Sequence, residues 1–229
     1  HLLSRRQRQM CIRDRVRTVP LTMEEWHRQR EIMVSQNDKY SFELGFATFY
    51  MNRTNRSGII KGGVIGGLEQ AGSWTMDVRF NREELIKRIQ SIAARKKDIT
   101  LYNKDINSFI THYVPMYEDN ALIYFDPPYY KKGKQLYMNF FTREDHVRIE
   151  TVIREHVHCD WIITYDDAPE IEEIYTRYDL YLYDLNYSVS AKCKASELII
   201  FRNSNLAPSN EELILNKIKV NIRPYNQHE

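Results

Sequence analysis

The sequence predicts an α/β fold with a second, mostly helical unit before it. Two observations favour this fold class. Residues 98–203 alternate segments rich in β-branched and aromatic residues with amphipathic segments, as strands and helices do in an α/β sheet. Residues 22–97 instead show helical patterns around a polar loop. A chain of 229 residues is long enough for one sizeable core and a small subdomain.

Residues 1–17 account for the basic character of the chain. They hold six Arg and one Asp, whereas the remaining sequence has 27 basic and 30 acidic residues. A solvated basic arm and a nucleic-acid-binding tail are two interpretations of this segment. The stretch LLSRRQRQMCIRDR also resembles translated sequencing-adapter sequence. We prefer this third interpretation, in which the segment is not native and the natural protein begins earlier.

Three helices and one loop are expected in the unit that follows, residues 18–97. Residues 22–36 begin with Thr22 and Glu25 in the capping-box spacing. Residues 40–51 are apolar enough for a buried helix, and residues 83–97 are amphipathic. The loop covers residues 52–81, and we interpret its GGVIGG stretch as flexible.

Residues 98–205 form the predicted α/β unit, and residues 206–229 are expected to be a C-terminal tail. Strands are predicted at 98–103, 121–125, 161–167, 180–190 and 196–203, and helices at 106–114, 142–157 and 169–178. The last two strands would form an antiparallel hairpin at the sheet edge. We expect Asp166 and Asp167 to cap the helix that starts at Pro169.

The stretch NALIYFDPPYYKKG, residues 120–133, is the most informative. An apolar strand runs into Asp126, and open α/β sheets bind ligands at the carboxyl ends of their strands. Asp126 offers a carboxylate, and Pro127 offers a carbonyl without an N–H group. Pro128 holds Pro127 extended, and Tyr129 offers a flat aromatic face. A simple turn at the end of a strand is the alternative interpretation.

This set of groups suits a planar ring that carries an exocyclic amine, such as adenine or cytosine. Two acceptors beside one aromatic face can take both amine hydrogens. Such acceptance keeps lone-pair density on the amine nitrogen, which makes it a better nucleophile without a strong base.

The corner resembles the DPPY motif of amino-methyltransferases, and residues 18–205 resemble the DNA adenine methylase group of N6-adenine-specific DNA methyltransferases. Six segments carry the resemblance in the order of that group: FYMNRTNRSGI (49–59), LYNKDINSFI (101–110), FDPPYY (125–130), NFFTREDHVRI (139–149), WIITYDD (161–167) and KCKASELIIF (192–201). The resemblance implies a Rossmann-like methyltransferase sheet, with residues 18–97 as a target-recognition region. Cytosine N4 methylation is less favoured, because that chemistry usually has Ser in place of Asp126.

The resemblance also implies a role for each residue of the corner. Asp126 and the Pro127 carbonyl would accept from the adenine N6 amine, Pro128 would shape the corner, and Tyr129 would stack on a base flipped out of the duplex. The methyl donor would be S-adenosylmethionine, and no metal is expected. Asp105 would accept from the donor's adenine amine, beside Ile106. A helix N-cap is the other interpretation of Asp105.

One departure from the family is evident. Upstream of residue 49 the sequence lacks the family's Gly-rich strand–turn motif, which grips the methionine part of the donor. We therefore expect an incomplete sheet and an N-terminally truncated fragment that binds the donor weakly or not at all.

A nucleic-acid interface is predicted in residues 53–97, which hold ten basic and four acidic residues. The expected DNA contacts are Asn52, Arg53, Asn55, Arg56, Ser57 and Lys61. Residues 87–97 are better explained as a solvated helix face.

Two functions from different classes remain. The favoured one is a site-specific adenine methyltransferase that acts on double-stranded DNA, from a phage or from a restriction–modification system with a cognate endonuclease. The alternative is a catalytically inactive nucleic-acid-binding relative. The sequence has no apolar run near the roughly 20 residues of a membrane span, so no membrane partner is expected. Three Cys without disulfide or metal spacing indicate a reducing cytoplasm, in a bacterial or phage-infected cell.

Overall fold

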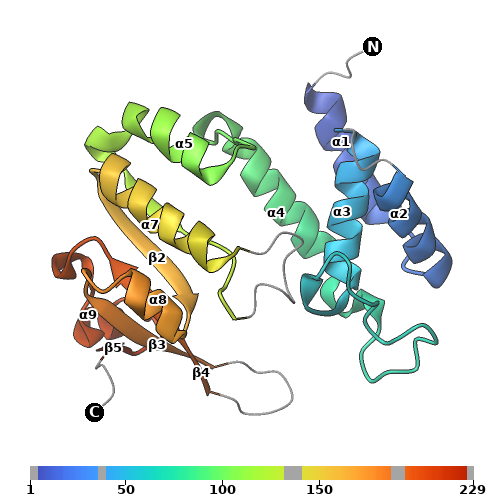
Figure 1. The fold of residues 1–229 in the computed structure, drawn as a ribbon. Coiled ribbons are helices and arrows are strands. Elements are labelled where there is room, and N and C mark those ends of the chain that lie inside the picture. Colours follow the sequence, from blue (N-terminus) through green and yellow to red (C-terminus); the bar gives the residue numbers. More distant parts are fainter. Residues whose placement is uncertain (1–4, 36–39, 132–140, 187–193, 226–229) are drawn as a thin grey trace. The chain divides into compact units, whose positions relative to one another are not determined.

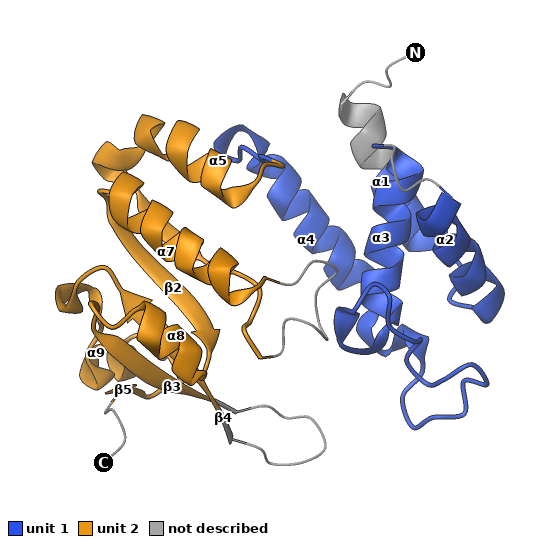
Figure 2. Ribbon diagram, viewed as in Figure 1, with its two compact units in different colours: residues 1–102 blue, residues 103–229 orange. Residues whose placement is uncertain are grey.

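The computed structural model describes residues 5–35, 40–131, 141–186 and 194–225. The chain divides into two compact units, residues 1–102 and residues 103–229 (Figure 2). The predicted division fell at residue 97, a few residues earlier. None of the helices in the described ranges is long and apolar enough to cross a membrane.

Four α-helices build the described part of the first unit: α1 Arg5–Thr18, α2 Met23–Ser35, α3 Phe42–Thr54 and α4 Arg82–Ala94 (Figure 1). The three helices expected in this region are therefore confirmed. The Thr22 hydroxyl accepts the Glu25 N–H at 3.3 Å, as the capping pattern predicted. Asn81 caps α4 by accepting the Glu84 N–H.

Aromatic side chains form the core of this unit. Trp26, Phe46 and Tyr50 are each at most 2% exposed, and Phe80 packs against Tyr50. Val16 of α1 is fully buried in the same core. The Arg82 guanidinium donates to the Val16 carbonyl at 2.6 Å. Val16 belongs to residues 1–17, the segment expected to be non-native. The end of that segment thus packs as part of this unit.

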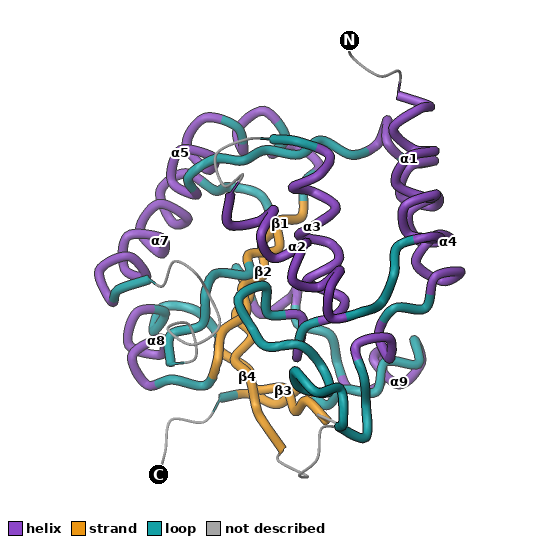
Figure 3. Tube along the Cα trace, turned by 90° about the vertical axis from the view of Figure 1, so that its right-hand side faces the viewer, coloured by secondary structure: helices purple, strands orange, loops and turns teal. Residues whose placement is uncertain are grey.

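The second unit is built on a five-stranded sheet in the order β1–β2–β4–β3–β5. Its strands are β1 Leu122–Phe125, β2 Asp160–Asp166, β3 Leu180–Asn186, β4 Lys194–Phe201 and β5 Ile222–Pro224 (Figures 1 and 3). β1 and β2 are parallel, and the other pairings are antiparallel. The sheet is therefore mixed and mostly antiparallel.

Helices cover the two faces of this sheet differently. α5 Ile106–His112, α7 Arg143–His156 and α8 Pro169–Ile174 contribute to one core with the inward side chains of β1, β2 and β4. α9 Asn210–Leu215 packs in a smaller cluster that includes Ile162 and Ile199. Successive strand residues point to opposite faces, so Ile163 and Ile162 belong to different clusters.

Two expectations about the sheet are wrong. Residues 98–103 form no strand: Leu101 is 92% exposed, and the segment pairs with no described strand. A strand needs a neighbour for its backbone groups, and an apolar pattern alone does not supply one. The hairpin of β3 and β4 exists, but β5 pairs with β3 and takes the edge position.

The expected C-terminal tail, residues 206–229, holds α9 and β5. Ser209 opens α9 with a capping box to Glu212. Ile222 is 9% exposed in the α9 cluster. These residues add to the sheet unit, since they close one of its faces.

Candidate active site and nucleic-acid interface

The Asp-Pro-Pro-Tyr corner follows β1 directly. Phe125, the last residue of β1, pairs in register with Ile163 of β2 and is 6% exposed. Asp126 comes next and is exposed, but partial burial still removes part of its hydration. Because β1 and β2 are parallel, their carboxyl ends meet at one edge of the sheet, and the corner lies at that edge.

A cavity of about 250 Å³ lies beside the corner. Its lining includes Asp126 and Pro127 from the corner and Ile106 from α5. Phe141, just before α7, and Ile149 of α7 also line it. Most of these side chains are apolar, so the cavity suits a flat, weakly polar group with polar atoms at one end.

Asp105 caps the helix that Ile106 opens. One oxygen of its carboxylate accepts the N–H groups of Asn107 and Ser108, at 3.0 and 3.2 Å. The N-cap interpretation of this residue is therefore confirmed. The cap also fixes the start of α5, and with it the position of Ile106 at the cavity.

A row of polar side chains crosses the sheet next to the corner. Asp166 of β2 pairs in register with Glu197 of β4, and Glu197 pairs with Tyr183 of β3. Side chains that pair in this way lie on the same face. The Tyr183 hydroxyl donates to the Glu197 carboxylate, which is only 2% exposed.

The row influences the charge of the corner. Partial burial raises the pKa of Asp126, and the negative charge of Glu197 raises it further. Burial and the hydrogen bond to Glu197 also raise the pKa of Tyr183 well above its ordinary value. Tyr183 therefore stays a neutral donor to Glu197 at physiological pH.

Backbone hydrogen bonds hold the far end of the corner. The Tyr130 N–H donates to one oxygen of Asp166 at 2.7 Å, and the Lys131 N–H donates to the other at 2.8 Å. The Lys131 ammonium also donates to the Asp167 carbonyl at 2.8 Å. The chain that leaves β1 is thus fastened to the end of the neighbouring strand.

Aromatic rings surround a buried histidine behind this anchor. His146 is fully buried, and its ring lies 5.4 Å from that of Tyr130 and 5.6 Å from that of Phe141. Its Nδ1 lies 3.1 Å from the Tyr165 hydroxyl. Burial lowers the pKa of His146, although two nearby carboxylates oppose the shift. The imidazole is therefore held neutral.

In the first unit, half of the expected DNA-contacting residues hold the loop together. Asn55 is fully buried: its Oδ1 accepts from the Trp26 indole at 2.8 Å, and its Nδ2 donates to the carbonyls of Ile59 and Ile60. The Asn52 amide donates to the Gly58 carbonyl, and the Arg53 guanidinium donates to the Arg79 carbonyl.

Arg56, Ser57 and Lys61 instead lie exposed on this loop. A bridge between Asn55 and Val64 closes the base of the loop. Its tip turns through Ser57 and Gly58, both with positive φ, and a Cβ on Gly58 would lie 2.9 Å from the Asn52 side chain. Glycine is therefore needed at this turn. The loop is therefore fixed, and its three exposed side chains are accessible to a partner.

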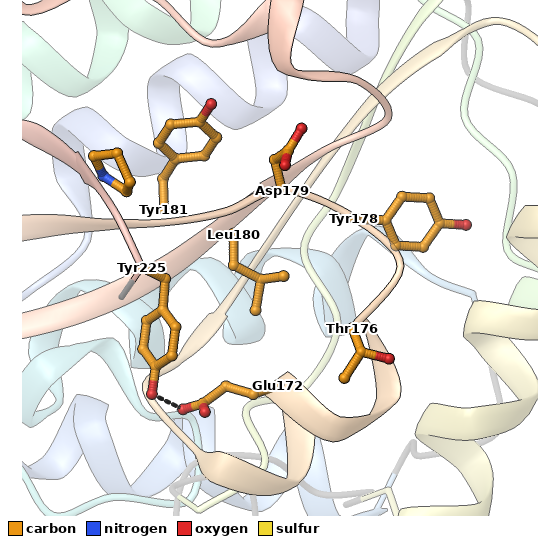
Figure 4. Close-up of a pocket in the computed structure, with 8 residues that line it drawn as sticks. Glu172, Thr176, Tyr178, Asp179, Leu180, Tyr181 and Tyr225 are labelled. Carbon is orange, nitrogen blue, oxygen red and sulfur yellow. Dashed lines mark hydrogen bonds between the residues drawn. The ribbon is translucent and has the colours of Figure 1, made fainter. Parts of the chain in front are cut away.

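A second cavity, also about 250 Å³, lies beside the segment that joins α8 to β3, next to β5 (Figure 4). Its lining includes Glu172, Asp179, Tyr181 and Tyr225, and the Tyr225 hydroxyl donates to Glu172. Leu180 of β3 pairs with Ile200 of β4, which pairs with Ile163 of β2, the residue opposite Phe125. This cavity shares no lining residue with the cavity beside the corner, and β2 and β4 lie between β1 and β3 in the sheet.

Sequence reasoning identified the corner but missed the groups that support it. The prediction that Asp166 and Asp167 cap the helix at Pro169 is wrong, because Ala168 is the N-cap of α8 and makes no side-chain cap bond. Glu197 does carry a signal in the sequence, because it is a lone carboxylate beside the apolar run LIIF. In the described part of the chain, no cluster of three or more His, Cys, Asp or Glu could hold a metal ion.

Comparisons with known proteins bear on the part of this arrangement that precedes β4. A family model described as D12 class N6 adenine-specific DNA methyltransferase matches residues 23–189. The match begins at the first residue of α2 and includes both the exposed loop and the corner. A search of curated proteins found no match.

Proposed function

The chain belongs to the family of D12 class N6 adenine-specific DNA methyltransferases, and on this premise we propose that it methylates the N6 amine of an adenine at a specific site in double-stranded DNA, with S-adenosylmethionine as the donor. The observation that carries the proposal is the corner of residues 126–129 at the carboxyl end of a parallel strand, with a cavity beside it. A turn that only ended a strand would not need such a cavity.

In this proposal the corner activates the amine through hydrogen bonds. Asp126 and the Pro127 carbonyl accept the two N6 hydrogens, which favours lone-pair density on nitrogen. Pro128 confines Pro127 to an extended backbone, which directs its carbonyl. Tyr129 stacks on the adenine ring, which must leave the duplex to reach these groups.

The cavity supports the assignment of the donor. Its apolar lining by Ile106, Phe141 and Ile149 fits an aromatic ring, with Asp126 at its polar end. Its volume of about 250 Å³ is below the roughly 300–1,000 Å³ of pockets that enclose whole ligands. The described residues would therefore hold the adenine part of the donor, near Asp105. When bound, the donor supplies an electrophilic methyl group.

The exposed loop is proposed to contact the DNA. Arg56 and Lys61 are suited to phosphates or base edges, and Ser57 to either. Asn52, Arg53 and Asn55 would act indirectly, because their side chains are engaged in holding the loop. A restriction endonuclease that cuts the same site would be the partner in a restriction–modification system.

The proposal is tested by expressing the protein from its gene in cells that lack adenine methylation and reading their DNA by modification-sensitive sequencing. N6-methyladenine at one short motif, absent with the Asp126→Ala variant, is the expected result. Unmodified DNA from a folded protein would overturn the proposal and favour the inactive nucleic-acid-binding relative.

A further inference from the structure

We propose that Asp166 is a positioning residue for methyl transfer, which it supports by fixing the far end of the corner that presents Asp126 and Tyr129. The inference rests on the function proposed above. It assigns a role to a carboxylate that is not among the lining residues of the cavity and that accepts from the backbone directly after the corner.

The near end of the corner is fixed by the sheet. Phe125 belongs to the parallel ladder of β1 and β2, opposite Ile163. Its side chain is 6% exposed and lies in the main core of the unit. Asp126 therefore begins from a position that the core determines.

The far end is fixed by Asp166. Its two oxygens accept the consecutive N–H groups of Tyr130 and Lys131, at 2.7 and 2.8 Å. Hydrogen bonds to an ionised acceptor are among the stronger ones in proteins. The carboxylate is 4% exposed, so water competes little for it. The Tyr130 ring adds a second contact at this end, against His146.

Only residues 126–129 lie between the two fixed ends. Two of them are proline, whose φ is confined to about −65°. The direction of the Pro127 carbonyl and of the Tyr129 ring therefore depends strongly on where the ends are held. Reactions between bound groups are sensitive to such placement, because an error of about 1 Å can cost about 100-fold in rate.

The test compares two neighbouring substitutions of equal size and charge change. Asp166→Asn removes one of the two acceptor oxygens and places an NH₂ donor near a backbone N–H. Asp167→Asn makes the same change at an exposed carboxylate, because Lys131 uses only the Asp167 carbonyl. Methylation of a duplex that carries the identified motif is measured as kcat and KM per folded molecule, beside DNA affinity.

For Asp166→Asn we expect kcat to fall by about 10- to 100-fold, with DNA affinity within about twofold of the unaltered protein. Asp167→Asn should keep the unaltered kcat. A folded Asp166→Asn variant with the kcat of Asp167→Asn would overturn the inference. If the unaltered protein methylates no DNA, the proposed function itself has failed, so the two failures are distinguishable.

A second measurement needs no variant and covers the case in which Asp166→Asn fails to fold. Amide hydrogen exchange in the unaltered protein should be slow at Tyr130 and Lys131, as expected for N–H groups bonded to a buried carboxylate. Exchange as fast as at Lys104, in the exposed segment before α5, would show that Asp166 holds neither group and would overturn the inference.

Discussion

Glu197 lies directly opposite Asp166 across the β2–β4 pair, and its negative charge acts on the catalytic candidate Asp126. The row therefore has two different effects on the corner. Asp166 holds its backbone, whereas Glu197 tunes its charge. Tyr183 completes the row by donating to Glu197, which lets a buried carboxylate remain in the sheet.

The effect of Glu197 predicts a change in the pH dependence of methylation. Glu197→Gln removes the charge but keeps an acceptor for Tyr183. The pKa of Asp126 should then fall toward its ordinary value, although partial burial still raises it. If ionised Asp126 is the active form, the acid limb of the pH–rate profile moves to lower pH. Exposed Glu211→Gln is the control, and an unmoved acid limb in Glu197→Gln contradicts the prediction.

Asp126→Asn should lower methylation without lowering the stability of the fold. A carboxyl group whose pKa is raised in the folded state stabilises the fold only while it is protonated, and this contribution is lost as the pH rises through the folded-state value. Ionised Asp126 therefore opposes folding at neutral pH. We expect a Tm equal to or above that of the unaltered protein, with methylation lowered by about 10²- to 10³-fold.

Thermal melts and methylation assays beside Asp119→Asn, another exposed aspartate, check this prediction. A clear loss of Tm in the Asp126→Asn protein would count against it, because Asp126 would then stabilise the fold.

The sequence allowed most of the fold to be predicted where local signals agree. The helix predicted over residues 142–157 starts as expected, because Thr142 and Asp145 form a capping box before α7. The apolar run before Asp126 correctly predicted β1. These signals are local, because hydrogen-bond caps and apolar patterns act within a few residues.

Pairing partners could not be predicted in the same way. Residues 98–103 have a strand-like pattern but no paired neighbour among the described strands. β5 has only three residues and depends on β3 for its pairing. The supporting row was missed for the same reason, since Asp166 and Glu197 are 31 positions apart and meet only through β-sheet register.

His146 should make the fold sensitive to acid. A histidine whose pKa is lowered by burial binds fewer protons in the folded state than in the unfolded state. Stability is then fully present above its ordinary value of 6.5 and decreases as the pH falls below it. We expect the Tm of the unaltered protein to fall between pH 7 and pH 5, and the fall to be smaller in His146→Phe.

The exposed His156 near the end of α7 provides a control for this experiment. His156→Phe should leave the acid dependence of the Tm unchanged. Equal falls in Tm for the unaltered protein and His146→Phe would assign the acid sensitivity to other groups.

Asn55 and Arg56 are neighbours in the sequence, but substitutions of the two residues should have different effects. Asn55→Ala leaves the Trp26 indole N–H and two carbonyls without their partner. A buried group that loses its hydrogen bond costs about 1–3 kcal/mol, so the Tm should fall. Arg56→Ala removes an exposed side chain and should leave the Tm unchanged while it weakens DNA binding.

The way in which Arg56→Ala weakens binding identifies its contact. If Arg56 binds a phosphate, affinity falls equally for all DNA sequences. Binding then releases about one counterion fewer, so affinity depends less steeply on salt concentration. If Arg56 binds a base edge, discrimination against altered motifs is lost at one position, by about 1–3 kcal/mol. Unchanged DNA affinity in Arg56→Ala would remove this loop residue from the proposed interface. An Asn55→Ala protein with the Tm of the unaltered protein would contradict the structural role of Asn55.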